Sequence, residues 1–187
     1  MIKLHLGCGQ HRLEGWENLD YPAVDIRKLL IWGNGSVEYI FTEHVIEHLT
    51  PQEGWRFFEE CYRVLAPWGV VRTTFPDIVK VWSHKTPSYM NFLKSRHWGD
   101  GLPQSTIRHL VFNHGHKSLW TPHLILSVLD ALGFSAKEVP LYASTYPCLN
   151  NVEGHWKSIG GEACDLESVA VEAVKELSEP VAGKGLH

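Results

Sequence analysis

Short runs of apolar and β-branched residues recur along the chain, and glycine, proline or serine bounds most of them, which predicts strands. The run at residues 3–6 stops at Gly7, and the run at residues 70–75 stops at Pro76. Between such runs lie stretches with helical spacing of apolar residues. The predicted strands are residues 3–6, 17–20, 37–41, 70–75, 136–139 and 168–174.

Two helices between these strands have clear start signals. Thr50 is a good N-cap, Pro51 suits the first helical position, and Glu53 completes a capping box. Apolar side chains follow at helical spacing at Trp55, Phe58, Tyr62 and Leu65. The second helix begins at residues 121–122 and ends at Gly133.

Strands that alternate with helices predict an α/β fold, with a mostly parallel sheet and helices on both of its faces. In such a sheet, ligands bind at the carboxyl ends of the strands, so residues directly after each early strand are the functional candidates. Residues 83–120 form a long excursion that is typical of a lid or binding element, or of a structural cover. We expect one domain over residues 1–179 and a loose tail over residues 180–187.

Composition narrows the class of protein. Apolar residues make up 44% of the 187, and the net charge of −4 is a poor match for a nucleic-acid backbone, so nucleic acid is an unlikely partner. The four cysteines form no C-x-x-C pair, which indicates reduced thiols. No signal peptide is visible, and no apolar run approaches the ~20 residues of a membrane span. We therefore expect a cytoplasmic protein without a membrane span.

A glycine bend follows the first predicted strand, in the segment LGCG of residues 6–9. Glycines let a ligand approach the backbone where a Cβ would collide. Arg12 stands where a dinucleotide-binding fingerprint has its third glycine, which argues against an NAD site. Asp20, at the end of the second predicted strand, can accept hydrogen bonds from both hydroxyls of a ribose. It also fits a turn aspartate before residues 21–22.

His44, Glu47 and His48 follow the central predicted strand in the pattern H-x-x-E-H. On a helix, His44 and His48 would share one face and could bind zinc, with Glu47 as the base, as in inverted zinc peptidases. The alternative is that these side chains line a pocket without a metal.

In their order and spacing, five segments together resemble class I S-adenosylmethionine-dependent methyltransferases: LHLGCG, NLD, DIRKL, SVEYIFTEHVIEHL and ECYRVLAPWGVVRTTFPD. They are similar to the glycine loop, ribose acid, adenine-side acid, central strand and "RVLKPGG" turn of that family. Two later segments resemble those of a compact bacterial subgroup of predicted methyltransferases: NHGHKSLWTPHLILSVLDALGF and LNNVEGH…VAVEAVK. Some members of that subgroup are encoded near sugar-modification genes. The resemblance covers roughly residues 2–177 and implies a Rossmann-like fold.

The resemblance also implies roles for individual residues. The methionine part and ribose of the cofactor would be wrapped by Leu6, Gly7, Cys8 and Gly9. Asp20 would bind the ribose hydroxyls. The adenine would lie beside Tyr21, Asp25 and Ile26. The site near the sulfonium would be closed by Thr42, Glu43 and His44.

Three departures from the family pattern stand out. His5 occupies the position that is often an Asp or Glu, which helps to anchor the cofactor's amino group. About ten residues separate Gly9 from Asp20, so the first helix must be very short or absent. Ala66 and Trp68 replace the usual Lys and Gly of the turn.

The implied reaction is an in-line transfer of the sulfonium methyl group to a small molecule or sugar, at oxygen. The protein would supply positioning and proton removal. His44 is the first candidate base, because imidazole titrates near neutrality, and Glu43 is the second. His48, His114 and His116 are further candidates, and the pair His114 and His116 is too small a set to predict a metal site. The alternative functions are a non-catalytic cofactor-binding or partner protein and the zinc peptidase.

Overall fold

The computed structural model describes residues 1–83, 87–99, 101, 102, 104, 108, 111 and 113–177, with the side chains of residues 87 and 88 excluded. The predicted tail at residues 180–187 and the predicted end of the domain at residue 179 lie outside the described residues.

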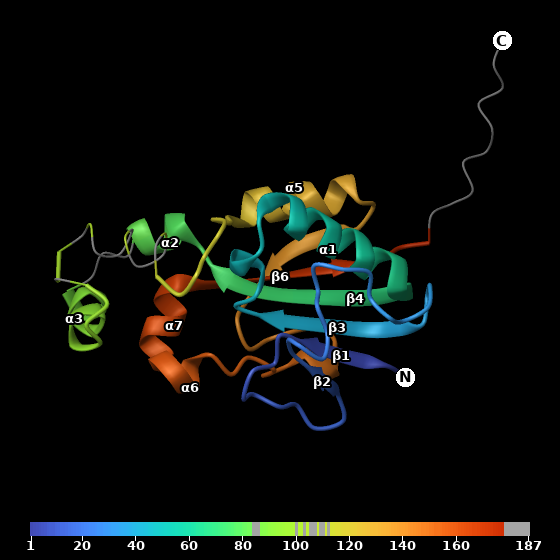
Figure 1. Ribbon diagram of the computed structural model, residues 1–187, viewed down its shortest axis with the longest axis horizontal. Coiled ribbons are helices and arrows are strands. Elements are labelled where there is room, and N and C mark those ends of the chain that lie inside the picture. The colour runs from blue at the N-terminus through green and yellow to red at the C-terminus, as the bar shows by residue number, and fades with distance from the viewer. Residues whose placement is uncertain are drawn as a thin grey trace, which may run out of the picture.

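Six strands form one sheet in the order β2-β1-β3-β4-β6-β5 (Figure 1). They are β1 (Lys3–Leu6), β2 (Glu17–Leu19), β3 (Val37–Glu43), β4 (Leu65–Pro76), β5 (Ser135–Val139) and β6 (Ser168–Val174). The pairs β2–β1, β1–β3 and β3–β4 are parallel, whereas β6 runs antiparallel to both β4 and β5. The predicted α/β fold with a mostly parallel, Rossmann-like sheet is confirmed.

The two helices with clear start signals are α1 (Pro51–Val64) and α5 (Pro122–Ala131), and both lie on one face of the sheet (Figure 1). The capping box is present: Glu53 N donates to Thr50 Oγ1 at 3.2 Å, and Thr50 N donates to Glu53 Oε2 at 2.8 Å. Each unpaired N–H at a helix start needs such an acceptor, which is why the sequence signal is reliable here.

Shorter elements gather beyond the carboxyl ends of β3 and β4 (Figure 1). They include η1 (Ile46–His48), α2 (Ile78–Ser83), α3 (Pro87–Ser95), α6 (Trp156–Ile159) and α7 (Gly161–Glu167), while η2 (Pro147–Leu149) lies in the β5–α6 connection. A second apolar cluster joins α2, α3, α6 and α7 around Val81, Leu93 and Ala163. Among the described helices, none has the length and apolar character needed to cross a bilayer.

One face of the sheet is apolar and carries the main core. Register aligns Leu4, Ile40, Val71, Ala173 and Ala136 in a row across five strands. Because side chains at one register position of neighbouring strands point to the same face, this row meets α1 and α5. The first four of these side chains are fully or almost fully buried, as are Phe57 and Phe58 of α1 in the same cluster.

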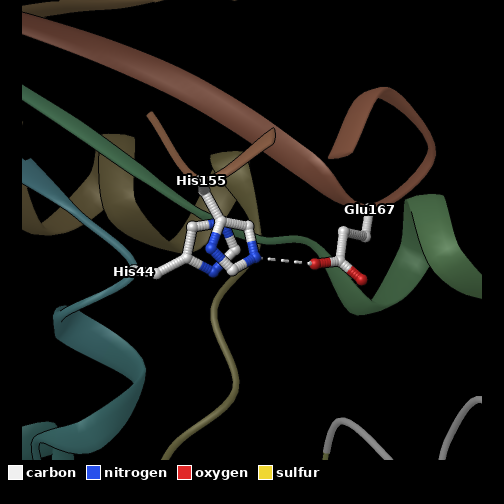
Figure 2. Close-up of side chains that lie close together, drawn as sticks. All are labelled: His44, His155 and Glu167. Atoms are coloured by element: carbon white, nitrogen blue, oxygen red, sulfur yellow. Dashed lines mark ion pairs between the residues drawn. The ribbon is translucent and has the colours of Figure 1, made fainter. Parts of the chain in front are cut away.

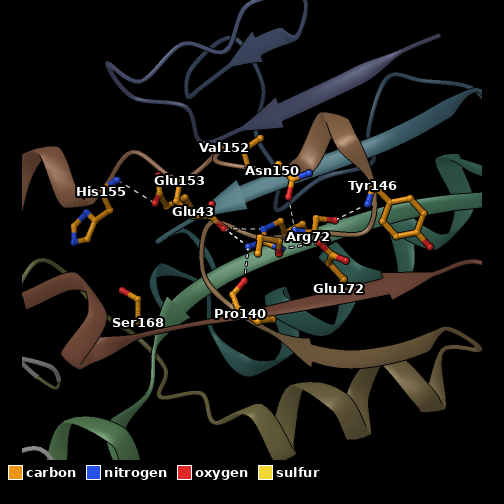
Figure 3. Close-up of polar contacts among 12 residues, drawn as sticks. Glu43, Arg72, Pro140, Tyr146, Asn150, Val152, Glu153, His155, Ser168 and Glu172 are labelled. Carbon is orange, nitrogen blue, oxygen red and sulfur yellow. Dashed lines mark hydrogen bonds and ion pairs between the residues drawn. The ribbon is translucent and has the colours of Figure 1, made fainter. Parts of the chain in front are cut away.

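The opposite face of the sheet carries a largely polar row of side chains, shifted by one residue along each strand from the apolar row. Register aligns Asn18, His5, Phe41, Arg72 and Glu172. The irregular segment from residue 140 to residue 154 contacts this row, because Arg72 donates to the carbonyl oxygens of Pro140 and Ala143 (Figure 3).

The prediction of helices on both faces therefore needs correction. Among the described residues, the polar face has a loop with one 3-10 turn where we expected helices. The prediction of a very short or absent first helix is confirmed, since residues 7–16 contain turns and no helix. Because that helix is absent, the segment at residues 140–154 covers the polar row instead.

Candidate functional site

A cleft of about 610 Å³ opens at the carboxyl ends of β1, β2 and β3. We call it the glycine cleft; it is lined by Gly7, Asp20, Tyr21, Val24, Asp25, Ile26, Arg27, His44, Val45, His48, Leu49 and Lys117. Its volume is within the range of small-molecule sites, and its place in the sheet is where ligands bind in open α/β folds. The structure thus brings together six of the residues predicted to contact a cofactor: Gly7, Asp20, Tyr21, Asp25, Ile26 and His44.

The glycine bend and Asp20 lie side by side, as predicted. Gly7 N and Cys8 N both donate to Leu19 O, at 2.8 and 3.2 Å, which fixes the bend against the end of β2. Gly9 N then donates to Asp20 Oδ2 at 2.9 Å. Gly7 and Gly9 have φ values of +73° and +48°, in the left-handed region that favours glycine.

Asp20 has capacity left for a ligand. Its Oδ2 accepts from Gly9 N, and its Oδ1 accepts from Tyr21 N at 2.8 Å. A carboxylate has about four lone-pair sites, so two of them are free for hydroxyl donors. The side chain is exposed at the cleft wall, where a diol can reach it.

The guanidinium of Arg27 binds Asp25, one of the residues predicted to lie beside the adenine. Arg27 binds Asp25 with two side-chain hydrogen bonds, Nε to Oδ1 at 2.7 Å and Nη2 to Oδ2 at 2.9 Å. The guanidinium also lies over the Tyr21 ring, 5.7 Å from its centroid. Hydrogen bonding by Arg27 lowers the pKa of Asp25 to about 2. Asp25 lines the cleft as an ion-paired carboxylate, beside the apolar Ile26.

Other predicted contact residues do not line the glycine cleft. Leu6 and Cys8 are buried, and Thr42 is buried with its Oγ1 bonded to Thr73 Oγ1 at 3.0 Å. The carboxylate of Glu43, the second candidate base, accepts three backbone hydrogen bonds, from Gly154 N and His155 N. These contacts make Glu43 an anchor for the loop that follows residue 152.

His5, the departure from the family pattern, is buried in the polar row under Phe41 and beside Asn18. Its ring centroid lies 4.9 Å from that of Phe41, and its Nδ1 is 3.2 Å from Asn18 Oδ1. Burial lowers the pKa of His5 from 6.5 to about 4. The side chain is therefore neutral at pH 7, and it fills the sheet face where an acidic residue is expected.

A pH dependence of stability follows from His5. Between pH 6.5 and 4 the unfolded chain binds a proton on this imidazole that the folded chain rejects, so the free energy of unfolding falls as pH decreases. The contribution of His5 to the free energy of unfolding is complete above about pH 6.5. It shrinks by roughly 2 kcal/mol between pH 6.5 and 5. Urea unfolding at several pH values should show a flatter profile for H5N than for the wild type. The exposed His123, changed to Asn, is the control; equal profiles for H5N and the wild type would contradict the assignment.

A second cavity of about 420 Å³ adjoins the glycine cleft. We call it the histidine pocket; it is lined by His44, Glu47, His48, Pro76, Phe92, Trp98, His114, His116, His155, Ile159 and Glu167. His44 and His48 line both cavities. They form a shared wall between the two cavities.

His44 has a defined setting at the end of β3. Its φ is +51°, and its backbone N donates to Thr74 O at 2.9 Å. Its Nδ1 lies 3.2 Å from Glu47 Oε1, and its Nε2 lies 2.9 Å from Ser168 Oγ. Burial lowers the pKa of His44, but contact with Glu47 and the charges of Glu167 and Glu43 outweigh it, so the pKa lies above its ordinary value.

Sequence reasoning missed His155 and Glu167. The His155 ring stacks on that of His44 with centroids 3.8 Å apart, and its Nε2 lies 3.5 Å from Glu167 Oε1 (Figure 2). Tyr89 O–H donates to the other oxygen of Glu167. More than 100 positions separate His44 from both residues. The segment LNNVEGH, quoted for the family resemblance, contains His155, but the resemblance implied no role for it.

The segment with the H-x-x-E-H pattern does not form an α-helix. β3 ends at Glu43, and only a 3-10 turn at η1 follows, so His44 and His48 do not share the helical face that an inverted zinc peptidase requires. Their ring nitrogens belong to two different clusters of metal-ligating side chains. This corrects the geometry on which the peptidase hypothesis depends.

Comparisons with known proteins agree with the fold described above. Residues 4–73 match a family described as a methyltransferase domain. A search of curated proteins found no match. A SAM dependent methyltransferase from Archaeoglobus fulgidus is similar in structure, with 15% identity, a TM-score of 0.56 and coverage of 93% of this chain and 86% of that one.

A chain from the complex between the Haloferax volcanii Trm112 methyltransferase activator and its methyltransferase is also similar. It has 12% identity and a TM-score of 0.51, and the match covers 90% of this chain. This chain spans only 65% of the length of that one. Both likenesses concern the fold. Residues 4–73 thus resemble a methyltransferase domain, and the chain shares the Rossmann-like fold of these methyltransferase structures.

Proposed function

We propose that the chain transfers a methyl group from S-adenosylmethionine in the glycine cleft to an acceptor in the histidine pocket. The observation that carries this proposal is the shared wall: His44 and His48 line both cavities. Two ligands in adjoining cavities can present a methyl donor and an acceptor atom to each other at short range.

The glycine cleft suits the nucleoside part of the cofactor. Asp20 has free lone pairs for the ribose hydroxyls, and the bare backbone at Gly7 and Gly9 admits the sugar and the methionine part. Tyr21 and Ile26 offer apolar surface to the adenine. When bound, the cofactor supplies an electrophilic methyl group on a sulfonium. The chain binds and orients the cofactor and limits the access of water to the cleft.

The histidine pocket suits a polar acceptor, and we propose a small molecule or sugar that is methylated at oxygen. Phe92 and Trp98 offer flat surfaces of the kind that pack against sugar rings, and imidazoles surround them. His44 is the candidate that removes the proton, because it lies at the shared wall and Glu47 stabilises its cationic form. The four free cysteines suit the reducing cytoplasm that we propose as the location.

Calorimetric titration with S-adenosylhomocysteine tests the binding half of the proposal. We expect saturable binding to the wild type and roughly 30-fold weaker binding to D20A, about 2 kcal/mol, because hydrogen bonds to a carboxylate are lost. The exposed Asp130 of α5, changed to Ala, is the matched control and should bind as the wild type does. Equal affinity of D20A and the wild type would reject the ribose assignment.

A screen of sugars and small phenols with radiolabelled S-adenosylmethionine tests the transfer half. Label on an acceptor supports the enzyme. Binding of S-adenosylhomocysteine without transfer to any acceptor class would favour the alternative of a non-catalytic cofactor-binding or partner protein. One of the similar structures is a complex between the Haloferax volcanii Trm112 methyltransferase activator and a methyltransferase. The screen should therefore include an arm with added lysate, in which a missing activator could restore transfer.

A further inference from the structure

Glu47 is a buried carboxylate at the wall of the histidine pocket. It is 2% exposed, and neither of its oxygens accepts a hydrogen bond from the described residues. His44 Nδ1 lies 3.2 Å from Oε1, which is an ion-pair contact with one of the two oxygens. A carboxylate withdrawn from water needs its lone pairs satisfied, so the setting of Glu47 indicates a further cationic partner.

Two imidazoles lie where such a partner would be bound. Ligand atoms of Glu47, His48 and His116 lie within 4.8 Å of one another. The rings of His48 and His116 meet edge to face, with centroids 5.0 Å apart. A tetrahedral ion with bonds of about 2 Å places its ligand atoms about 3.3 Å apart, so small side-chain rotations would complete the site.

Backbone hydrogen bonds hold His116 in this position. Lys117 N and Ser118 N donate to Glu47 O at 2.8 and 3.2 Å. Trp120 Nε1 donates to Ile46 O at 3.1 Å. The segment after His116 is thus fastened to η1, the turn that carries the other two side chains. A site supported by such contacts is organised before the ion arrives.

We propose that Glu47, His48 and His116 bind one divalent transition-metal ion, with Zn²⁺ as the best match, at the wall of the histidine pocket. Two imidazoles and one carboxylate are a common ligand set for Zn²⁺ sites that keep a position open. All three side chains line the pocket, so the open position faces it. This ligand set differs from the peptidase pattern, because Glu47 is a ligand and His44 is not.

The other cluster is less suited to an ion. His44 and His155 are stacked at an interplanar angle of 25°, so their in-plane lone pairs run nearly parallel and do not converge on one point (Figure 2). His44 Nε2 already contacts Ser168, and Glu167 already accepts from Tyr89. These contacts satisfy the cluster without a metal.

The ion has a consequence for the acceptor that rests on the proposed function. An oxygen ligand at the open position would be bound directly beside His44 and the shared wall. A metal-bound hydroxyl loses its proton more readily than a free one. The site would thus select acceptors with a hydroxyl or diol over purely apolar ones.

Metal binding is tested with the metal alone, without cofactor or acceptor. Untagged protein is dialysed against chelator, and Zn²⁺ and Co²⁺ are titrated by calorimetry and by the visible absorption of Co²⁺. We expect one ion per chain. Affinity should fall by at least about 100-fold in H116A and in E47A, because each removes a ligand. His114 lines the same pocket outside the ligand set, so H114A is the matched control and should bind as the wild type does.

Three outcomes would overturn the site. One is no saturable binding of either ion to the wild type. Another is unchanged affinity in H116A. The third is affinity that falls in H155A and not in H116A, which would assign the ion to the other cluster. Circular dichroism of each variant separates loss of a ligand from loss of fold, and H48A serves where E47A does not fold. S-adenosylhomocysteine titration of H116A is expected to be unchanged, so failure of the metal site and failure of the cofactor site remain distinguishable.

Discussion

Replacing Arg72 with methionine should destabilise the fold by about 3–5 kcal/mol, because it leaves two buried carboxylates without their counter-ion. The Arg72 side chain is fully buried between Glu153 and Glu172 (Figure 3). Its Nη1 lies 2.6 Å from Glu172 Oε1, and its Nε lies 2.7 Å from Glu153 Oε1. Burial raises the pKa of Glu153 even with Arg72 in place.

Urea unfolding of R72M against the wild type gives the loss directly. The exposed Arg56 of α1, changed to methionine, is the matched control and should change stability by less than about 0.5 kcal/mol. The triple variant R72M/E153Q/E172Q should recover part of the loss, since it removes the uncompensated charges. A loss below about 1 kcal/mol in R72M would show that the buried ion pairs contribute little.

Gly7→Ala should lower the free energy of unfolding by about 2–4 kcal/mol and weaken S-adenosylhomocysteine binding more than 100-fold. The φ of +73° costs an L-residue about 1–2 kcal/mol. A Cβ at Gly7 would also lie 2.3 Å from Val45 Cγ2, which forces an overpacking cost of about 1–3 kcal/mol. Because Gly7 lines the cleft, either adjustment moves the backbone that the cofactor approaches.

Two further variants separate these causes. G7A/V45A removes the collision and keeps the left-handed strain, so it should recover stability in part. Gly9→Ala is the matched control for stability alone, because its Cβ would meet only Asp20 Oδ2 at 4.0 Å and its φ of +48° is tolerated better. Thermal unfolding measures the loss of stability, and calorimetry measures the loss of S-adenosylhomocysteine binding. Equal thermal stability of G7A and G9A would contradict the steric explanation.

Local patterns in the sequence were enough to predict the sheet and one side of the site. Strand ends are marked by Gly7 and Pro76, and helix starts by Thr50 and Thr121, because backbone conformation and unpaired N–H groups dictate those residue types. The proximity of Gly7 and Asp20 follows from parallel neighbouring strands, whose carboxyl ends meet at one edge. Such inferences need only the chain's local order.

The histidine pocket could not be predicted in the same way. His155 reaches His44 only because Glu43 binds the amides of residues 154 and 155, and no local pattern states that a carboxylate will be used there. His116 joins Glu47 through backbone bonds between distant segments. Both contacts depend on how segments without regular secondary structure pack against each other. Helices on both faces were predicted from the alternation of strands and helices along the chain. That alternation did not show that the first helix is absent or that the loop at residues 140–154 covers one face of the sheet.

The loop that takes the place of those helices links the stability of the sheet to the shape of the histidine pocket. The segment at residues 140–154 closes the polar face through Arg72, and the next residue along the chain is His155. Here a substitution that reshapes one side of the pocket also loosens the sheet. Substitutions that probe the proposed acceptor pocket should therefore begin at Trp98 and His114, which line the pocket and lie outside residues 140–155.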